Sequence, residues 1–254
     1  MQEQPAVWVL ELIAISEGVV IMAKRGKKYQ QVSTLVNSDG EYTLEEACDL
    51  VKKTTITSFD ASVDIDIRLG IDPRHADQMV RGTVSLPHGT GKDIRVLALV
   101  NEAKQDEARE AGADYVGLDD YIVKIGEGWV EIDVIIATPD VMGKLGKLGR
   151  FLGPRGLMPN PKSGTVTMEV ANAVKTVKAG QIDFRVDKAG ILHTTIGKVS
   201  FNSEQIRENA EAFLSTVMRL KPSSSKGIYV KSVFMSSTMG PSIPISRTAV
   251  TSLN

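Results

Sequence analysis

The stretch from Gly143 to Gly156, GKLGKLGRFLGPRG, combines glycines and cations as phosphate-binding loops do. Nucleotide-binding loops require the order G-x-x-x-x-G-K-[ST] or G-x-G-x-x-G, because their backbone amides must meet the phosphates in a fixed geometry. The stretch has neither order. It lies in a segment without acidic residues, from Val141 to Thr167, that carries five cations: Lys144, Lys147, Arg150, Arg155 and Lys162. We expect a basic loop, stiffened by prolines, that contacts phosphate or a partner; a long ordered connector is the alternative.

Patterns for catalysis or metal binding are missing from the sequence. The three histidines, His75, His88 and His193, are too scattered to form a ligand set, and the one cysteine cannot complete it. No G-x-S-x-G nucleophile turn occurs. We therefore expect no catalytic residues, no metal, no cofactor and no enzyme activity. Two rival functions stay open: a small-molecule enzyme built on the central part of the chain, and a protein-interaction scaffold.

Composition indicates an ordinary α/β protein with a polarised charge. The chain has 254 residues, 42% of them hydrophobic, which suffices for one large core or two modest ones. The net charge is −1, yet residues 181–254 carry nine basic and five acidic side chains. This surplus favours a phosphate-rich partner toward the C-terminus, although a solvated surface would look the same. Cys48 lies in a helical pattern and is expected to be a buried thiol.

The N-terminal region contains an apolar run, residues 6–22, that Glu11 and Glu17 interrupt. It fits neither a signal peptide nor a membrane span, since both need an uninterrupted apolar stretch. The basic sequence that begins at Met22, MAKRGKKYQ, suggests a second start and a basic arm of the kind found on nucleic-acid-binding proteins. The alternative is that residues 1–21 are a genuine extension.

The outer parts of the chain show alternating strands and capped helices. Phe59 to Ile71 alternates strictly between apolar and polar residues, which predicts a half-buried strand. Capping-box spacings predict helices over 42–55 and 202–220. The remaining predicted strands are 83–86, 182–186, 191–198 and, as the last, 227–234; residues 187–190 are expected to form a hairpin turn between 182–186 and 191–198.

The central part has another style, in which continuous apolar strands alternate with helices. The predicted strands are 94–100, 115–117 and 134–137, and the predicted helices are 102–111, 119–126 and 168–179, with one more beginning at Asp140. Such alternation is typical of a parallel sheet covered on both faces. We therefore expect a discontinuous α+β domain, residues 22–89 and 181–254, with an α/β domain of residues 90–180 inserted in it. Glycines at the junctions, Gly89, Gly91 and Gly180, would permit hinge motion.

Five segments resemble a known family. They are FLGPRGLMPNPKSGTV (151–166), VRGTVSLPHGTGK (80–92), AGADYVG (111–117), KAGILHTTIGKVSF (188–201) and SSTMGP (236–241). They resemble the L-one family of large-subunit ribosomal proteins, bacterial type, over most of the chain after residue 21. The resemblance implies a split β-α-β RNA-binding domain with an inserted Rossmann-like three-layer α/β domain. It also implies a cytoplasmic protein of the ribosome that is monomeric when free and has no membrane partner.

The resemblance further implies the partners and their contacts. The partners are large-subunit ribosomal RNA at the mobile stalk, transfer RNA leaving the exit site, and the messenger RNA of the protein's own operon. The implied RNA-binding residues are Phe59, Ser62, Lys188, His193, Thr195, Gly197, Lys198, Ser237, Thr238, Met239 and Gly240. One departure is Ser58, where relatives often carry lysine beside the phenylalanine, so one phosphate contact is in doubt. The low overall basicity is a second departure.

Overall fold

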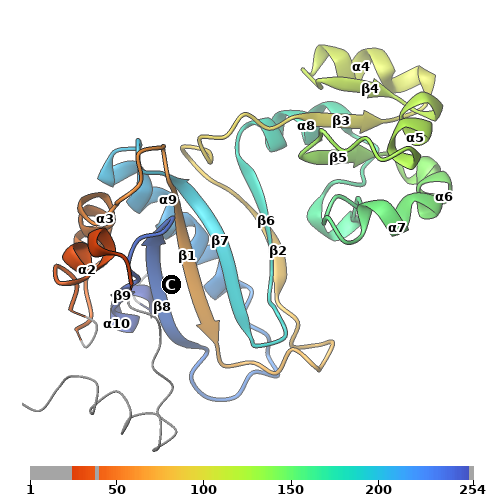
Figure 1. The fold of residues 1–254 in the computed structure, drawn as a ribbon. Helices are drawn as coiled ribbons and strands as arrows, with labels where there is room; N and C mark the ends of the chain where they lie inside the picture. The colour runs from red at the N-terminus through yellow and green to blue at the C-terminus, as the bar shows by residue number, and fades with distance from the viewer. Residues whose placement is uncertain (1–24, 38–39, 252–254) are drawn as a thin grey trace, which may run out of the picture.

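The structure is a computed structural model that describes residues 25–37 and 40–251. The expectations for residues 1–21 and for a start at Met22 lie outside the described residues. Figure 1 shows the fold as two bodies joined by two segments of the chain. One body combines the two ends of the described chain, and the other is built from its middle.

The larger body is built on a four-stranded antiparallel sheet in the order β7-β1-β8-β9. These strands are β1 (Ser62–Leu69), β7 (Ile191–Lys198), β8 (Val230–Ser237) and β9 (Ile243–Ile245). The alternation predicted for β1 is confirmed, because Val63, Ile65, Ile67 and Leu69 are all at most 2% exposed. Their side chains share one face of the sheet, since successive side chains point to opposite sides.

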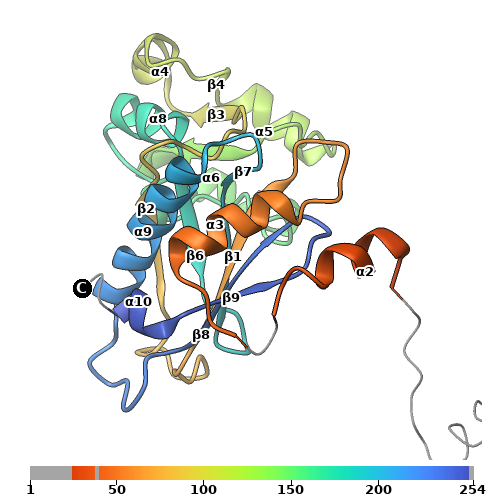
Figure 2. The same cartoon turned by 90° about the vertical axis from the view of Figure 1, so that its left-hand side faces the viewer.

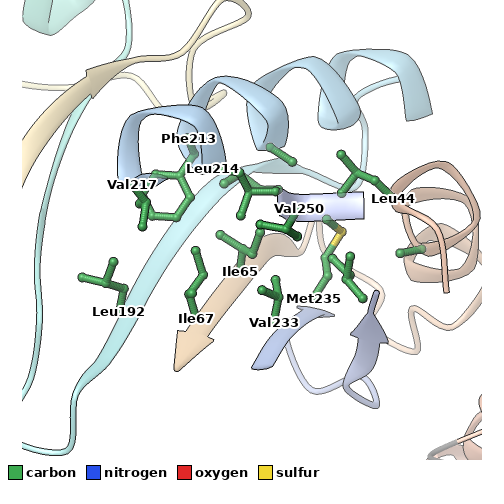
Figure 3. Close-up of a cluster of buried hydrophobic side chains, with 14 of the residues drawn as sticks. Leu44, Ile65, Ile67, Leu192, Phe213, Leu214, Val217, Val233, Met235 and Val250 are labelled. Atoms are coloured by element: carbon green, nitrogen blue, oxygen red, sulfur yellow. The ribbon is translucent and has the colours of Figure 1, made fainter. Parts of the chain in front are cut away.

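Two helices cover this apolar face, α3 (Leu44–Lys53) and α9 (Ser203–Arg219). Figure 3 shows Phe213, Leu214 and Val217 of α9 directed at the sheet. Both helices begin with the predicted caps. The Glu46 amide donates to Thr43 Oγ1 over 3.3 Å, and the Asn202 amide donates to Gln205 Oε1 over 3.0 Å. The caps fix where the helices begin, and the apolar stripe fixes which face packs.

The predicted hairpin of residues 182–186 with 191–198 is wrong. Strand β6 (Gln181–Arg185) pairs antiparallel with β2 (Arg81–Ser85) as a separate two-stranded ribbon, while β7 pairs with β1. The turn between β6 and β7 is still closed by a hydrogen bond, which the Asp187 amide donates to the Ile191 carbonyl over 2.9 Å. Strand β7 pairs with β1 along its whole length. Strand β6 lies outside the large sheet and forms with β2 a ribbon that extends toward the second body (Figure 1).

The second body is built on a parallel sheet, as predicted, and its strand order is β4-β3-β5. Its elements are β3 (Val96–Leu99), α4 (Gln105–Glu110) after the 3-10 turn Glu102–Lys104, β4 (Tyr115–Gly117), α5 (Asp119–Gly126), β5 (Val134–Ala137) and α8 (Val170–Lys178). Alternate residues of β3 belong to different apolar clusters: Leu97 and Leu99 to one, Val96 and Ala98 to the other. The sheet is therefore covered on both faces, which accounts for its continuous apolar strands.

Two further expectations need correction, the basic loop and the strand 227–234 as the last element of the sheet. The stretch expected to be a basic loop is helical up to Leu152: Pro139–Val141 (3-10), α6 (Met142–Leu145), Gly146–Leu148 (3-10) and α7 (Gly149–Leu152), with Pro161–Ser163 (3-10) later. Leu145, Leu148 and Leu152 recur at helical spacing and are at most 5% exposed, and this burial stabilises the helical path despite the glycines. The basic arm includes a helix, α2 (Lys27–Ser33), and two elements follow β8, namely β9 and α10 (Arg247–Thr251).

The two connections between the bodies contact each other at glycines. Gly89 and Gly180 both have positive φ, 65° and 98°. A Cβ atom on Gly180 would lie 2.3 Å from the Gly89 Cα, so only glycine fits this crossing. The apolar clusters do not mix across it, because one draws only on residues 36–86 and 184–250 and the other two only on 96–177. The domain boundaries at 89/90 and 180/181 stay a proposal, which this separation supports.

Candidate functional site

One end of the large sheet collects most of the predicted site residues. β1 begins where β7 and β8 end, because both pair antiparallel with it. The register places Ser62 opposite Lys198 and Val63 opposite Ser237. Phe59, which precedes β1, and residues 238–240, which follow β8, extend this end (the upper end of the sheet in Figure 1). Segments that lie far apart in sequence thus form one surface, which we call the sheet end.

Ser62, Lys198 and Thr238 are joined by hydrogen bonds at the sheet end. The Thr238 amide donates to the Ser62 carbonyl over 3.0 Å, and the Ser62 amide donates to Thr238 Oγ1 over 3.2 Å. Lys198 Nζ donates to Ser62 Oγ over 3.0 Å. These bonds hold one ammonium group and two hydroxyl groups in a fixed arrangement, which suits a polar ligand that carries phosphates and hydroxyls.

Met239 lies in a strained turn beside this group. Among the described residues it is the one non-glycine residue with positive φ, 66°. The turn is closed by the Gly240 amide, which donates to the Ser237 carbonyl over 2.8 Å. A Cβ atom on Gly240 would lie 2.4 Å from Ser237 Oγ, so the turn needs glycine there. The turn holds Met239 in solvent, 71% exposed, and Phe59, 58% exposed, belongs to the same end of the sheet.

The polar face of β1 and β7 carries carboxylates that engage two predicted site residues. Thr195 Oγ1 donates to Asp64 Oδ1 over 2.6 Å, and His193 Nδ1 lies 2.6 Å from Asp66 Oδ1. His193 Nε2 is also 3.9 Å from Asp187 Oδ2. The negative charges oppose phosphate at this face, so it suits the hydroxyls and base edges of a nucleic acid better than its backbone.

Two predicted site residues are placed differently from the rest. Lys188 lies in the turn before β7, at the opposite end of that strand from Lys198, and eight residues of strand separate the two by about 23 Å or more. Gly197 is buried, and a Cβ atom there would lie 3.0 Å from the Phe201 ring. The structure therefore gives Gly197 a packing role and does not bring Lys188 to the sheet end.

The predicted basic stretch of the second body presents most of its cations to solvent. Lys147, Arg150 and Arg155 are exposed on the side opposite the buried leucines. Lys144 Nζ lies 2.9 Å from Asp119 Oδ1, so part of its charge is already compensated. Lys162 lies instead beside the space between the two bodies, together with Asn160, which caps the 3-10 turn by accepting from the Lys162 amide over 3.0 Å.

Sequence reasoning missed one buried polar residue, Asn209 of α9, which is 0% exposed. Its Oδ1 accepts from the His88 amide over 3.0 Å, and its Nδ2 donates to the carbonyls of Gly89 and Ile196 over 2.9 and 2.8 Å. Asn209 thus fixes the first connection to the large sheet. A polar residue within an otherwise apolar helical stripe was the available signal, because a buried amide must find partners.

Charges at the start of the second body form a local cluster. Lys92 Nζ lies 2.5 Å and Arg95 Nε 3.2 Å from the Asp133 carboxylate, whose side chain is 19% exposed. Burial would raise the pKa of Asp133, but the hydrogen bonds from Lys92 and Arg95 outweigh it and lower that pKa to about 2. In the described ranges no group of three or more His, Cys, Asp or Glu side chains is arranged to hold a metal ion. No described helix is long and apolar enough to cross a membrane.

Comparison with known proteins gives consistent matches over most of the chain. A sequence model of the ribosomal protein L1p/L10e family matches residues 51–241. Large ribosomal subunit protein uL1 of Porphyromonas gingivalis is 62% identical over 224 residues, which cover 88% of this chain and 97% of that protein. The proteins of the same name from Chlorobium chlorochromatii and Bacteroides thetaiotaomicron are 61% and 60% identical over 220 and 229 residues, covering 87% and 90% of this chain and 96% and 99% of theirs.

Proposed function

The chain belongs to the ribosomal protein L1p/L10e family, and we propose that it binds large-subunit ribosomal RNA through the sheet end. As a member of this family it is a structural constituent of the large ribosomal subunit. The family's members are generally not enzymes, which agrees with the expectation drawn from the sequence.

The observation that carries this proposal is the arrangement at the start of β1. Lys198 and Thr238 meet at Ser62, and two exposed apolar side chains, Phe59 and Met239, belong to the same end of the sheet. Structured RNA is recognised through its shape, its 2′-hydroxyls and its unstacked bases rather than through phosphates alone. The ammonium group of Lys198 can contact a phosphate, the hydroxyls of Ser62 and Thr238 can contact 2′-hydroxyls, and the apolar side chains can contact unstacked bases.

We propose that Thr195 and His193 extend the interface along β7. The Thr195 hydroxyl donates its hydrogen bond to Asp64, which leaves the threonine oxygen free to accept one from a 2′-hydroxyl. Lys188 would meet RNA only if the RNA runs the length of the strand. The exposed cations Lys147 and Arg150 on the second body are proposed as additional phosphate contacts.

The finer functions follow from the kind of RNA that this surface would accept. We propose binding at the mobile stalk, with contact to transfer RNA as it leaves the exit site. We also propose that a messenger RNA that presents a similar fold binds the same surface, so that the protein represses its own operon. Rotation of the two bodies about Gly89, Gly91 and Gly180 is proposed to accompany binding, because few contacts besides these connections oppose it.

The test is RNA binding by the full chain, measured by fluorescence anisotropy on a stalk fragment of large-subunit RNA over a range of salt concentrations. Thr238→Ala should weaken binding by about 1–3 kcal/mol and leave the salt slope unchanged, because it removes no charge. Lys198→Gln should lower the slope by roughly one unit. Lys226→Gln, an exposed lysine that precedes β8 and so lies beyond the opposite end of that strand from Thr238, is the matched control. Wild-type affinity no better than for an unrelated RNA would refute the proposal.

A second measurement addresses the messenger and the transfer RNA. Unlabelled leader RNA from the protein's own operon should displace the stalk fragment from the wild-type chain, and Thr238→Ala should weaken both RNAs equally. Independent binding of the two RNAs would mean that repression, if it occurs, uses another surface. Large subunits that lack the protein should release transfer RNA from the exit site more slowly, and normal release would refute that part.

A further inference from the structure

A cavity of about 490 Å³ lies between the two bodies, away from the sheet end. One wall is the ribbon of β2 and β6, and the other is the segment that follows α7, residues 153–165. The walls meet where Gln181 Nε2 donates to the Ser163 carbonyl over 3.5 Å. The volume falls within the roughly 300–1,000 Å³ of ligand sites, and both walls contribute polar groups.

The ribbon places two arginines side by side on the cavity wall. Arg81 and Arg185 are direct partners in the antiparallel register. Their neighbours in the register, Gly82 and Phe184, are on the other face, where Phe184 packs against Phe213 with ring centroids 5.2 Å apart. Alternation therefore places both arginine side chains on the face away from the core, and both line the cavity.

Asp183 lies on the same face of the ribbon, yet among the described residues neither arginine forms an ion pair with it. Like charges directly opposite each other in a sheet are destabilising. Within the described part of the chain neither arginine forms an ion pair; the one polar contact of Arg185 is Nη2 to Met79 Sδ at 3.5 Å. The unrelieved pair points to an anion that comes from outside the chain.

The other charged groups of the cavity leave it positive. Lys162 lies on the opposite wall, beside the capped turn at Asn160. Two carboxylates also line the cavity, but Asp133 is already bound by Lys92 and Arg95. Asp183 alone remains against three cations. A dianion or a chain of phosphates would fit this balance, because a guanidinium binds phosphate through two parallel hydrogen bonds.

We propose that this cavity is a second RNA site, in which Arg81, Arg185 and Lys162 hold backbone phosphates of an RNA strand that passes between the two bodies. The proposal rests on the RNA binding proposed above and adds contacts that neither the sheet end nor the exposed cations Lys147 and Arg150 supply. Because its walls belong to different bodies, phosphate in the cavity would also fix the separation between them.

The test compares two charge-matched double variants of the full chain on the stalk RNA fragment. Arg81→Gln with Arg185→Gln should lower the slope of log affinity against log salt by about 1.4–1.8 units, since each lost phosphate contact contributes about 0.7–0.9. Affinity at low salt should fall at least tenfold. The control, Lys175→Gln with Lys226→Gln, removes two exposed lysines, one from each body, and should change the slope by less than half a unit.

Further measurements separate failure of this inference from failure of folding or of RNA binding itself. The double arginine variant should melt no lower than the wild type, because it removes a repulsive pair. Inorganic pyrophosphate, compared with chloride at equal ionic strength, should raise the melting temperature of the wild type and not of that variant. Full wild-type slope in the variant, with RNA binding intact, would overturn the cavity site. A wild type that does not bind the RNA at all would overturn the proposed function instead.

Discussion

Replacing Met239 by glycine should stabilise the protein and weaken its binding to RNA. The backbone of Met239 is left-handed, with φ of 66°, which costs an L-residue about 1–2 kcal/mol. Glycine removes this strain but raises the entropy of the unfolded chain by an equivalent of about 0.4–1 kcal/mol. The net gain over Met239→Ala, which keeps the strain, is therefore about 1 kcal/mol. Loss of the side chain itself costs folding little, because it is 71% exposed.

The same exposure sets the expected effect on RNA binding. Full burial of a methionine side chain is worth about 1.5–3 kcal/mol, so an RNA that covers the exposed 71% would gain about 1–2 kcal/mol. Met239→Gly and Met239→Ala should both lose that amount. Urea unfolding of the two variants gives the stability difference, and anisotropy on the stalk fragment gives the affinities.

The two variants make the reasoning refutable at separate points. If Met239→Gly is no more stable than Met239→Ala, the turn stores no strain. If both variants bind RNA as the wild type does, Met239 is not part of the interface and the sheet end must be reassigned. Strained residues persist only where the surrounding structure holds them, and they cluster at functional sites. We therefore expect Met239→Gly to raise stability and to weaken RNA binding together.

Three other predictions concern the rest of the chain. Joining residue 89 to residue 181 through a short Gly-Ser linker should leave a fragment that unfolds cooperatively, because the apolar cluster of the larger body contains none of the deleted residues. Its affinity for the stalk RNA should be within about a hundredfold of that of the full chain. A thousandfold loss of affinity in a folded fragment would place the site in the second body. Asp133→Asn should cost on the order of 2 kcal/mol at pH 7, because the pKa of Asp133 is lowered from 3.8 to about 2. That stabilisation is complete above pH 3.8 and is lost as the pH falls through 2. The urea midpoints of the wild type and of Asp133→Asn should therefore converge as the pH approaches 2. A difference between the midpoints that stays constant down to pH 2 would contradict the prediction. Burial raises the pKa of the Cys48 thiol to about 12, so iodoacetamide should not modify it at pH 8 unless urea is added; rapid labelling of the folded protein would show that the thiol is accessible.

Local pattern predicted much of the fold where burial has a clear period. Strand β1 alternates because one face lies under α3 and α9, so its inward residues were readable from sequence. The parallel sheet was likewise readable, because strands covered on both faces are continuously apolar. In each case burial of one or both faces of a strand acts on adjacent residues, so it produces a pattern that can be seen in a short stretch of sequence.

The errors arose where the constraint is not local. β6 pairs with β2, about a hundred residues earlier, and nothing in the β6 sequence distinguishes that partner from the nearer β7. β9 is three residues long with Pro244 at its centre, a residue that normally argues against a strand. α2 has no buried residues and so leaves no apolar stripe. The Arg81–Arg185 pair was invisible for the same reason as the pairing of β2 with β6.

The placement of charge explains how a chain with a net charge of −1 can be built to bind RNA. On the polar face of β1 and β7 the carboxylates of Asp64 and Asp66 hold Thr195 and His193 in place, so the negative charge lies where we expect hydroxyls and base edges rather than phosphates. Unpaired positive charge lies instead in the cavity, at Arg81 and Arg185, where phosphates would be enclosed on two sides. We therefore assign the recognition of a particular RNA to the sheet end and most of the salt-dependent affinity to the cavity. It follows that replacing uncharged residues of the sheet end, such as Thr238 and Met239, should alter which RNA is bound with little change in the salt slope. Replacing the cavity arginines should weaken binding to all RNAs alike and should reduce the slope more than any single change at the sheet end.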